Sequence, residues 1–199
     1  MKKIMFNERY GLQQASFDGS KTMTRRIVPD KIKKDAFVYQ SHHIDDDRAY
    51  ERYILEHAPY KVGEIVAVAQ RYSQLVEEIE SLIERLGLPF IVKEEIRKHK
   101  GWDNKMYVRA EDMPRRIKIT GLRVEGLAGI SDEDCLKEGI THVPVGINHF
   151  GVRDLMKGVT YYYYTPYLAY KGLIDSLNKR GFFESNPLVY AYSYEMVEW

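Results

Sequence analysis

Residues 19–26 carry the side chains in this sequence that are best suited to chemistry: a lysine, two threonines and two arginines directly follow a glycine. A lysine whose pKa is lowered can act as a general base, and a threonine hydroxyl can act as a nucleophile or position a water molecule. We therefore take Lys21 and Thr24 as candidate catalytic residues. The alternative is a helix end followed by a strand whose basic side chains are simply solvated.

The elements around this segment decide whether the two side chains can meet. Asn7 could cap a short helix over residues 7–17, and Gly19 could end that helix in the left-handed conformation. Residues 22–28 have strand-forming types. Because side chains alternate along a strand, Lys21 and Thr24 would point to opposite faces unless the backbone turns between them.

A third candidate lies in a compact helix predicted over residues 131–139. Ser131 can cap its start, acidic residues fill its first turn and Gly139 can end it. Glu138 falls in the last turn, where the helix dipole disfavours a carboxylate by about 0.3–1 kcal/mol. This favours the protonated form, as a proton-donating acid needs, so Glu138 joins the candidate catalytic residues. The alternative is an exposed glutamate that tolerates a small penalty beside Lys137.

Other side chains could bind nucleic acid. Arginines could contact phosphates, and tyrosines, of which the chain has 16, could stack on bases. The candidate ligand-binding residues are Arg25, Arg26, Arg115, Arg116, Tyr190 and Tyr192. The alternatives are a solvated strand edge for the arginines and ordinary core packing for the tyrosines.

Hydrophobic patterning predicts the remaining elements. Strands are expected over residues 4–6, 65–70, 113–124 and 188–197, with a bulge or corner at Gly121. Helices are expected over residues 46–57, 73–87 and 166–181, the last capped by Thr165 with Pro166 in its first turn. Residues 29–45 and 141–159 are expected to be loops.

Composition narrows the class of protein. The chain has 199 residues, of which 44% are hydrophobic, and it has no apolar run of 18, so we expect a globular protein without a membrane partner. The single cysteine, Cys135, and a start too short for a signal peptide favour the cytoplasm. A solvated loop, rather than a metal site, is expected for His42 and His43 near the aspartates at 45–47. We predict no metal and no other cofactor.

Several blocks resemble ASCH domains, a branch of the PUA-like superfamily. Residues 19–26 resemble the G-x-K-T-x-T-x-R corner of this family, and residues 60–64 resemble the turn before a core strand. Residues 113–120, 124–127 and 130–140 resemble a run found in phage and prophage members, and residues 186–190 resemble their closing strand. The blocks stand in the right order and cover roughly half of the chain.

The resemblance implies an α+β fold: a small, mixed, bent PUA-like β-barrel with peripheral helices and a cleft facing a nucleoside or nucleic acid. It implies a single domain, 1–199, with insertions near 30–58, 73–100 and 141–165. Small bacterial members hydrolyse N4-acetylcytidine with a lysine, a threonine and a glutamate, which fall on Lys21, Thr24 and Glu138. Phage relatives often have V-R-E after the turn, whereas this chain has Val68, Ala69 and Gln70, so an arginine and a carboxylate are missing.

Two functions of different kinds follow. The first is hydrolysis of an amide on a modified pyrimidine of the N4-acylcytidine type. The second is non-catalytic binding, as in a phage accessory protein. The net charge of +1 favours a nucleoside or single-stranded RNA over a long duplex, with DNA as a further candidate. A third interpretation is that the helix at 73–86 binds a host protein. The sequence leaves the oligomeric state open.

Overall fold

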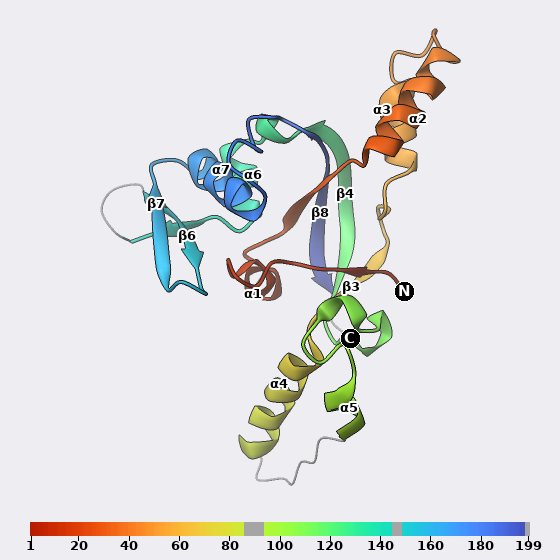
Figure 1. The fold of residues 1–199 in the computed structure, drawn as a ribbon. Helices are drawn as coiled ribbons and strands as arrows, with labels where there is room; N and C mark the ends of the chain where they lie inside the picture. The colour runs from red at the N-terminus through yellow and green to blue at the C-terminus, as the bar shows by residue number, and fades with distance from the viewer. Residues whose placement is uncertain (86–93, 145–148, 198–199) are drawn as a thin grey trace. The chain divides into compact units, whose positions relative to one another are not determined.

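The structure is a computed structural model that describes residues 1–85, 94–144 and 149–197. The chain forms two compact units. The smaller unit comprises Met1–Phe6, Ile65–Ile117 and Val197–Trp199, and the larger unit comprises Asn7–Glu64 and Lys118–Met196. The described residues form a mixed α+β fold with several helices and two sheets, as expected (Figure 1). Neither described sheet closes on itself, so the barrel is not confirmed.

The smaller unit is built on a pair of parallel strands. β1 (Lys3–Ile4) lies beside β3 (Ile65–Val68), with Lys3 opposite Ala67. The short 3-10 helices η1 (Lys105–Tyr107) and η2 (Ala110–Asp112) follow later in the chain. Small and apolar side chains make the core of this unit: Ala67, Ala69, Val108, Ala110 and Met113.

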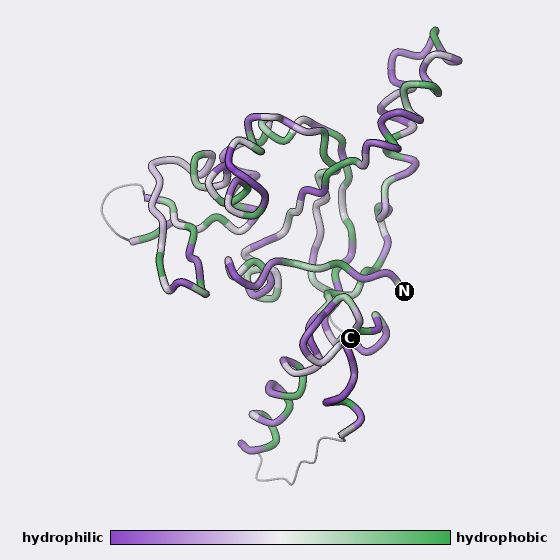
Figure 2. The backbone as a smooth tube through the Cα atoms, in the orientation of Figure 1, coloured by the Kyte–Doolittle hydropathy of each residue, from purple (hydrophilic) through white to green (hydrophobic). Residues whose placement is uncertain are grey.

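Helix α4 (Tyr72–Arg85) also belongs to the smaller unit, as does α5 (Glu94–Lys98). Figure 2 shows apolar and polar residues alternating along α4, as its sequence predicts. The helix begins one residue before the predicted Ser73 cap, because the Ser73 hydroxyl donates instead to the carbonyl oxygen of Trp102, at 2.8 Å. The predicted end at residue 87 lies outside the described residues.

Two long strands and a shorter one are the main strands of the larger unit. β4 (Arg116–Gly126), β8 (Leu188–Val197) and β2 (Met23–Ile27) are neighbours in that order. β2 runs antiparallel to β8, and Thr24 lies opposite Tyr192. β4 continues through residue 121, where a Cβ atom would lie 3.3 Å from the side chain of Ser193; the glycine thus lets β4 and β8 approach closely.

The predicted corner before β2 exists, with a shorter helix than expected. α1 (Leu12–Phe17) starts late because the Asn7 side chain accepts a hydrogen bond from Tyr10 N, which makes a turn there. Gly11, not Asn7, occupies the N-cap position. Gly19 has φ 79°, in the left-handed region, as predicted.

Two capped helices agree with the sequence at their starts. In α6 (Asp132–Lys137), Ser131 Oγ accepts from Asp134 N at 3.2 Å. In α7 (Pro166–Leu177), the Thr165 hydroxyl accepts from the backbone of Leu168 at 3.1 Å. The end of α7 was predicted at residue 181, but the helix stops at Leu177.

The two predicted loops were wrong. α2 (Asp30–Ser41) occupies most of the first and packs against α3 (Ala49–Glu56). The second contains a separate antiparallel sheet whose strand order is β5, β6, β7. Its strands are β5 (Thr141–Val143), β6 (His149–Asp154) and β7 (Val159–Tyr163).

α2 and the small sheet both depend on packing against other elements, which the local sequence does not reveal. α2 is mostly polar, and Ala36 is its one buried residue, so its stability comes from packing rather than from a marked apolar stripe. The strands of the small sheet are short and interrupted by a glycine, which weakens their alternation. Across the described residues, no helix combines the length and the apolar character that a membrane crossing requires.

Candidate active site

Lys21 and Glu138 form a buried ion pair in the larger unit. Lys21 Nζ lies 2.6 Å from Glu138 Oε2, 2.8 Å from the Glu138 carbonyl oxygen and 2.7 Å from the Met23 carbonyl oxygen. The Lys21 side chain is 1% exposed and that of Glu138 is 5% exposed. Two of the three candidate catalytic residues, 117 positions apart, are therefore in contact, as the sequence analysis expected.

Backbone contacts at the corner bring the two residues together. Lys21 N donates to the carbonyl oxygen of Ala15, and Thr22 N donates to that of Lys137, at 2.8 and 2.9 Å. Glu138 is the C-cap residue of α6. Gly139 follows with φ 99°, and a Cβ atom there would lie 3.6 Å from the Lys21 side chain. The positive φ, rather than lack of space beside the lysine, favours glycine at this point.

The hydrogen bonds of Lys21 indicate its charge state. The three acceptors match the three hydrogens that a protonated Lys21 ammonium group can donate. Burial is the largest influence on this group and lowers the pKa of Lys21. The Glu138 carboxylate opposes this effect, while the positive charges of Arg26 and Arg25 add to it.

Arg25 is not available to contact phosphate, contrary to expectation. Its side chain is 2% exposed, and its guanidinium is 3.1 Å from Glu138 Oε1, 2.6 Å from Glu125 Oε1 and 3.0 Å from Asp134 Oδ2. Burial works against its charge, but the carboxylates of Glu138 and Glu125 together raise the pKa of Arg25 above its usual value. The sequence could not show that β2 turns this arginine inward.

Thr24 lies in β2, 5% exposed, opposite Tyr192. It is adjacent to Arg25 in the strand, so the two side chains point to opposite faces of the sheet. Among the described residues, no hydrogen bond joins the Thr24 hydroxyl to Lys21 or Glu138. Of the predicted triad, Lys21 and Glu138 are therefore in direct contact, and Thr24 lies next to Arg25 in β2.

The two tyrosines chosen as base-stacking residues are in the core. Tyr190 and Tyr192 are both fully buried, and the ring of Tyr60 lies against that of Tyr192 with a centroid distance of 5.5 Å. A base could not stack on either ring without opening the core, so this expectation is wrong. Arg26, opposite Tyr190 in the register, is half-buried.

The other arginine pair lies at the end of the smaller unit. Arg115 Nη1 lies 2.9 Å from Gln70 Oε1 and 2.8 Å from Glu78 Oε2, and Gln70 Nε2 donates to Glu78 Oε1 at 3.1 Å. The side chains of Arg115 and Glu78 thus lie next to Gln70. They place an arginine and a carboxylate there, although positions 69 and 70 hold an alanine and a glutamine. Arg115 is engaged in an ion pair, and Arg116 is half-buried at the start of β4.

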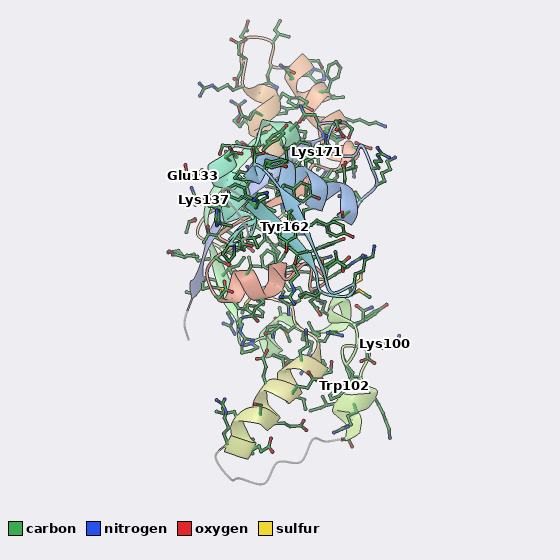
Figure 3. All side chains as sticks on the ribbon, turned by 90° about the vertical axis from the view of Figure 1, so that its left-hand side faces the viewer. Lys100, Trp102, Glu133, Lys137, Tyr162 and Lys171 are labelled. Carbon is green, nitrogen blue, oxygen red and sulfur yellow. The ribbon has the colours of Figure 1, made fainter. Side chains whose placement is uncertain are left out.

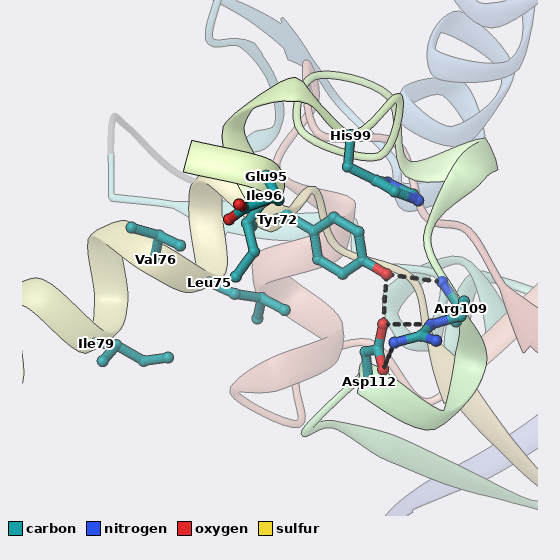
Figure 4. Close-up of a pocket in the computed structure, with 9 residues that line it drawn as sticks. All are labelled: Tyr72, Leu75, Val76, Ile79, Glu95, Ile96, His99, Arg109 and Asp112. Atoms are coloured by element: carbon teal, nitrogen blue, oxygen red, sulfur yellow. Dashed lines mark hydrogen bonds and ion pairs between the residues drawn. The ribbon is translucent and has the colours of Figure 1, made fainter. Parts of the chain in front are cut away.

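Two grooves are relevant to binding. In the larger unit, a groove of about 290 Å³ runs beside α1 and β6, and its lining includes Ser20 and Gly139, the chain neighbours of Lys21 and Glu138. In the smaller unit, a groove of about 550 Å³ lies between α4 and α5 (Figure 4). There Tyr72 donates to Asp112, which also binds Arg109 at 3.0 Å.

Sequence reasoning missed a group of charged residues around Arg25. Glu125 and Asp134 accept from Arg25 and also from Arg123, whose side chain is 47% exposed. Although burial works against it, hydrogen bonds from Arg25 and the charge of Arg123 hold the pKa of Asp134 below its usual value. The only available signal was the acidic first turn of α6, which the sequence analysis assigned to helix capping.

The outer face of α6 differs from this buried side. Glu133 and Lys137 lie near one another there (Figure 3), with 2.6 Å between Lys137 Nζ and Glu133 Oε1. Among the residues that the structure describes, no three histidine, cysteine, aspartate or glutamate side chains gather as a metal ion would require.

Comparisons with known proteins leave the family open. No family model matches the chain, and no curated protein matches it. Among solved structures, the chain is similar to a protein from Enterococcus faecalis V583 described as a DUF984 protein, with 13% identity and a TM-score of 0.39. The match covers 99% of this chain and 77% of that protein.

Proposed function

We propose that this protein is an ASCH-like amidohydrolase that acts on a modified pyrimidine nucleoside of the N4-acylcytidine type. The observation that carries the proposal is the contact of 2.6 Å between Lys21 Nζ and Glu138 Oε2. The two charges are almost fully buried, and burial lowers the pKa of Lys21, as a general base requires. Buried groups with a shifted pKa, such as Lys21, are concentrated at functional sites.

The reaction would begin with proton transfer within the pair. Lys21 passes a proton to Glu138, which gives a neutral amine and a neutral acid. The amine then accepts a proton from the nucleophile, either the Thr24 hydroxyl or a water molecule, whose oxygen forms a bond to the acyl carbon. Glu138 donates its proton to the departing N4 nitrogen as the C–N bond breaks, which restores both charges. If Thr24 is the nucleophile, water then hydrolyses the acyl-threonine.

Arg25, Tyr190 and Tyr192, three of the six contacts expected for the alternative, a binding module, are buried to the same degree as Lys21 and Glu138. Arg26 is half-buried and could still hold a base or phosphate. Membership of the ASCH family and a PUA-like barrel are part of the same proposal. They are supported by the resemblance of residues 19–26, 60–64, 113–120, 124–127, 130–140 and 186–190 to that family.

The test is hydrolysis of N4-acetylcytidine by the full chain, measured as cytidine released on a chromatographic column. Lys21→Met alone leaves a buried carboxylate, which costs about 3–5 kcal/mol, so Lys21→Met is combined with Glu138→Gln. Lys137→Met, on the exposed face of α6, is the matched control.

We expect the wild-type protein and the control to release cytidine and the paired variant to release none while keeping a native circular dichroism spectrum. With the Thr24 hydroxyl as nucleophile, Thr24→Ser should retain part of the activity and Thr24→Val should lose it; with water as nucleophile, Thr24→Val should stay active. Failure of the wild-type protein to release cytidine, or full activity in the paired variant, would contradict the proposal.

A further inference from the structure

Glu138 is held by two cations, one at each oxygen of its carboxylate. Lys21 Nζ lies 2.6 Å from Oε2, and Arg25 Nη1 lies 3.1 Å from Oε1. Both cations come from the same segment of chain, on either side of the start of β2. These two contacts hold the carboxylate in one orientation, and Arg25 provides one of them.

Arg25 itself is fixed from the other side. Its Nε lies 2.8 Å from Glu125 Oε1, and its Nη2 lies 3.0 Å from Asp134 Oδ2. These acids come from β4 and α6, so the planar guanidinium is anchored by two different elements. With 2% of its side chain exposed, Arg25 cannot rotate outward to meet a ligand without breaking these ion pairs.

We infer that Arg25 is a positioning residue that orients Glu138 and sets the sharing of the proton between Glu138 and Lys21. This inference rests on the proposed function, because it assigns a role within the same hydrolysis. Arg25 acts through Glu138 and touches no reacting atom. The sequence pattern had instead assigned Arg25 to phosphate contact.

The charges around the pair give the direction of the effect. A positive charge beside Lys21 disfavours a proton on its amine. The pKa of Lys21 is lowered chiefly by burial; the Glu138 carboxylate opposes this, and the charges of Arg26 and then Arg25 add to the lowering. The other titratable or charged groups that face the pair from the packed elements are Arg26 on β2, Glu125 on β4, Asp134 and Cys135 on α6, Tyr170 on α7 and Tyr194 on β8.

Three of these neighbours keep one charge state near neutral pH. Burial raises the pKa of Cys135 to about 12, and burial also raises the pKa of Tyr170 and of Tyr194 above the usual tyrosine value. They remain neutral, so a change in the titration of Lys21 on replacing Arg25 reports on Arg25 itself.

The experiment compares Arg25→Met, Arg25→Lys and Arg123→Met in the full chain. Arg123 binds the same two acids, Glu125 and Asp134, from a half-exposed position and is not in contact with Glu138 among the described residues. It therefore controls for loss of the surrounding ion pairs.

We expect Arg25→Met to lower kcat for N4-acetylcytidine about tenfold or more, with KM changed less than about twofold. The basic limb of its pH–kcat profile should move to higher pH, because Lys21 brings the proton that it passes to Glu138 and holds that proton more tightly without Arg25. Arg25→Lys should recover part of kcat, and Arg123→Met should keep the wild-type profile. Equal shifts in Arg25→Met and Arg123→Met would overturn the inference.

A second measurement does not depend on turnover. The titration of Lys21 is followed by ¹³C NMR of its Cε in the full chain, with the signal assigned by its absence from the paired variant. Arg25→Met should raise the pKa of Lys21 and Arg123→Met should not. If the wild-type protein releases no cytidine, the proposed function fails, and this titration still decides whether Arg25 sets the proton balance. An unmoved pKa in Arg25→Met would refute the inference.

Discussion

At the scale of single residues, the central feature is a cluster in which opposite charges balance. Lys21, Arg25 and Arg123 face Glu125, Asp134 and Glu138 through direct ion pairs. Transferring such charges out of water is costly, and a buried ion pair is weak evidence for stability by itself. The cluster tolerates this cost because each buried charge has an opposite partner and further hydrogen bonds.

The energetic coupling of Lys21 and Glu138 is directly testable. Lys21→Met should reduce the free energy of unfolding by about 3–5 kcal/mol, because it leaves a buried carboxylate with one partner fewer. The double variant Lys21→Met/Glu138→Met removes both charges and should lose less than the sum of the single variants. Urea denaturation provides the values, and strictly additive losses would mean that the two residues act independently.

The buried tyrosines of β8 allow a second test at this scale. The Tyr190 hydroxyl is buried and has no hydrogen-bond partner among the described residues, whereas Tyr194 donates to Ser16 Oγ at 3.2 Å. Tyr190→Phe should leave stability unchanged or slightly raised, because a buried hydroxyl without a partner is unfavourable. Tyr194→Phe should cost about 1 kcal/mol. Thermal unfolding followed by circular dichroism distinguishes the two, and a larger loss for Tyr190→Phe would mean that its hydroxyl has a hydrogen-bond partner.

At the scale of elements, the site depends on a helix end that lies against the corner before β2. Gly139 has φ 99°, and a Cβ atom there would lie 3.2 Å from Leu12 Cδ2. The backbone conformation favours glycine, and an added Cβ atom would also require the Leu12 side chain to shift by a few tenths of an ångström.

Gly139→Ala should therefore destabilise the protein by about 1–3 kcal/mol, because alanine is strained at positive φ. Gly129→Ala is the matched control, since a Cβ atom at residue 129 would meet nothing within 4 Å. Chemical denaturation should show a clear loss for the first variant and almost none for the second. Similar losses in both would mean that residue 139 has no special role.

Local sequence predicted the elements whose signals are local. The caps at Ser131 and Thr165, the left-handed Gly19 and the closing strand at 188–197 are all confirmed. The contact of Lys21 with Glu138 was also foreseen, but through the family resemblance together with the position of the glutamate in its helix.

What sequence could not provide was the direction of side chains and the effect of tertiary partners. Alternation does not say which face of β2 is buried, so Arg25 and Tyr190 were both assigned to ligand contact. α2 and the small sheet of β5, β6 and β7 form because neighbouring elements cover them, and no window of local sequence contains that information.

At the scale of the molecule, the candidate site lies wholly within the larger unit, whose small sheet is fastened to the segment before α1. Arg9 binds Asp154 at the end of β6 with Nε and Nη2, at distances down to 2.6 Å. Asp154 also accepts from the backbone of Met156 and Lys157, at 3.2 Å each. One carboxylate thus organises both the end of a strand and its attachment to the N-terminal corner.

This attachment should be sensitive to acid. The hydrogen bonds from Arg9 hold the pKa of Asp154 below its usual value, so the stability it contributes is complete above the ordinary aspartate pKa. That stability is lost as the pH falls through the lowered pKa. Asp154→Asn should be less stable than the wild type at neutral pH, and the difference should shrink in acid. A difference that stayed constant with pH would contradict this assignment.

The most direct test of the central claim follows the acetyl methyl signal of N4-acetylcytidine by proton NMR in the presence of the full chain. We predict that this signal disappears as the methyl signal of free acetate grows by the same amount, and that neither changes with the variant carrying both Lys21→Met and Glu138→Gln. A substrate signal that persists unchanged with the wild-type protein would contradict the claim that the buried lysine–glutamate pair is a hydrolytic site.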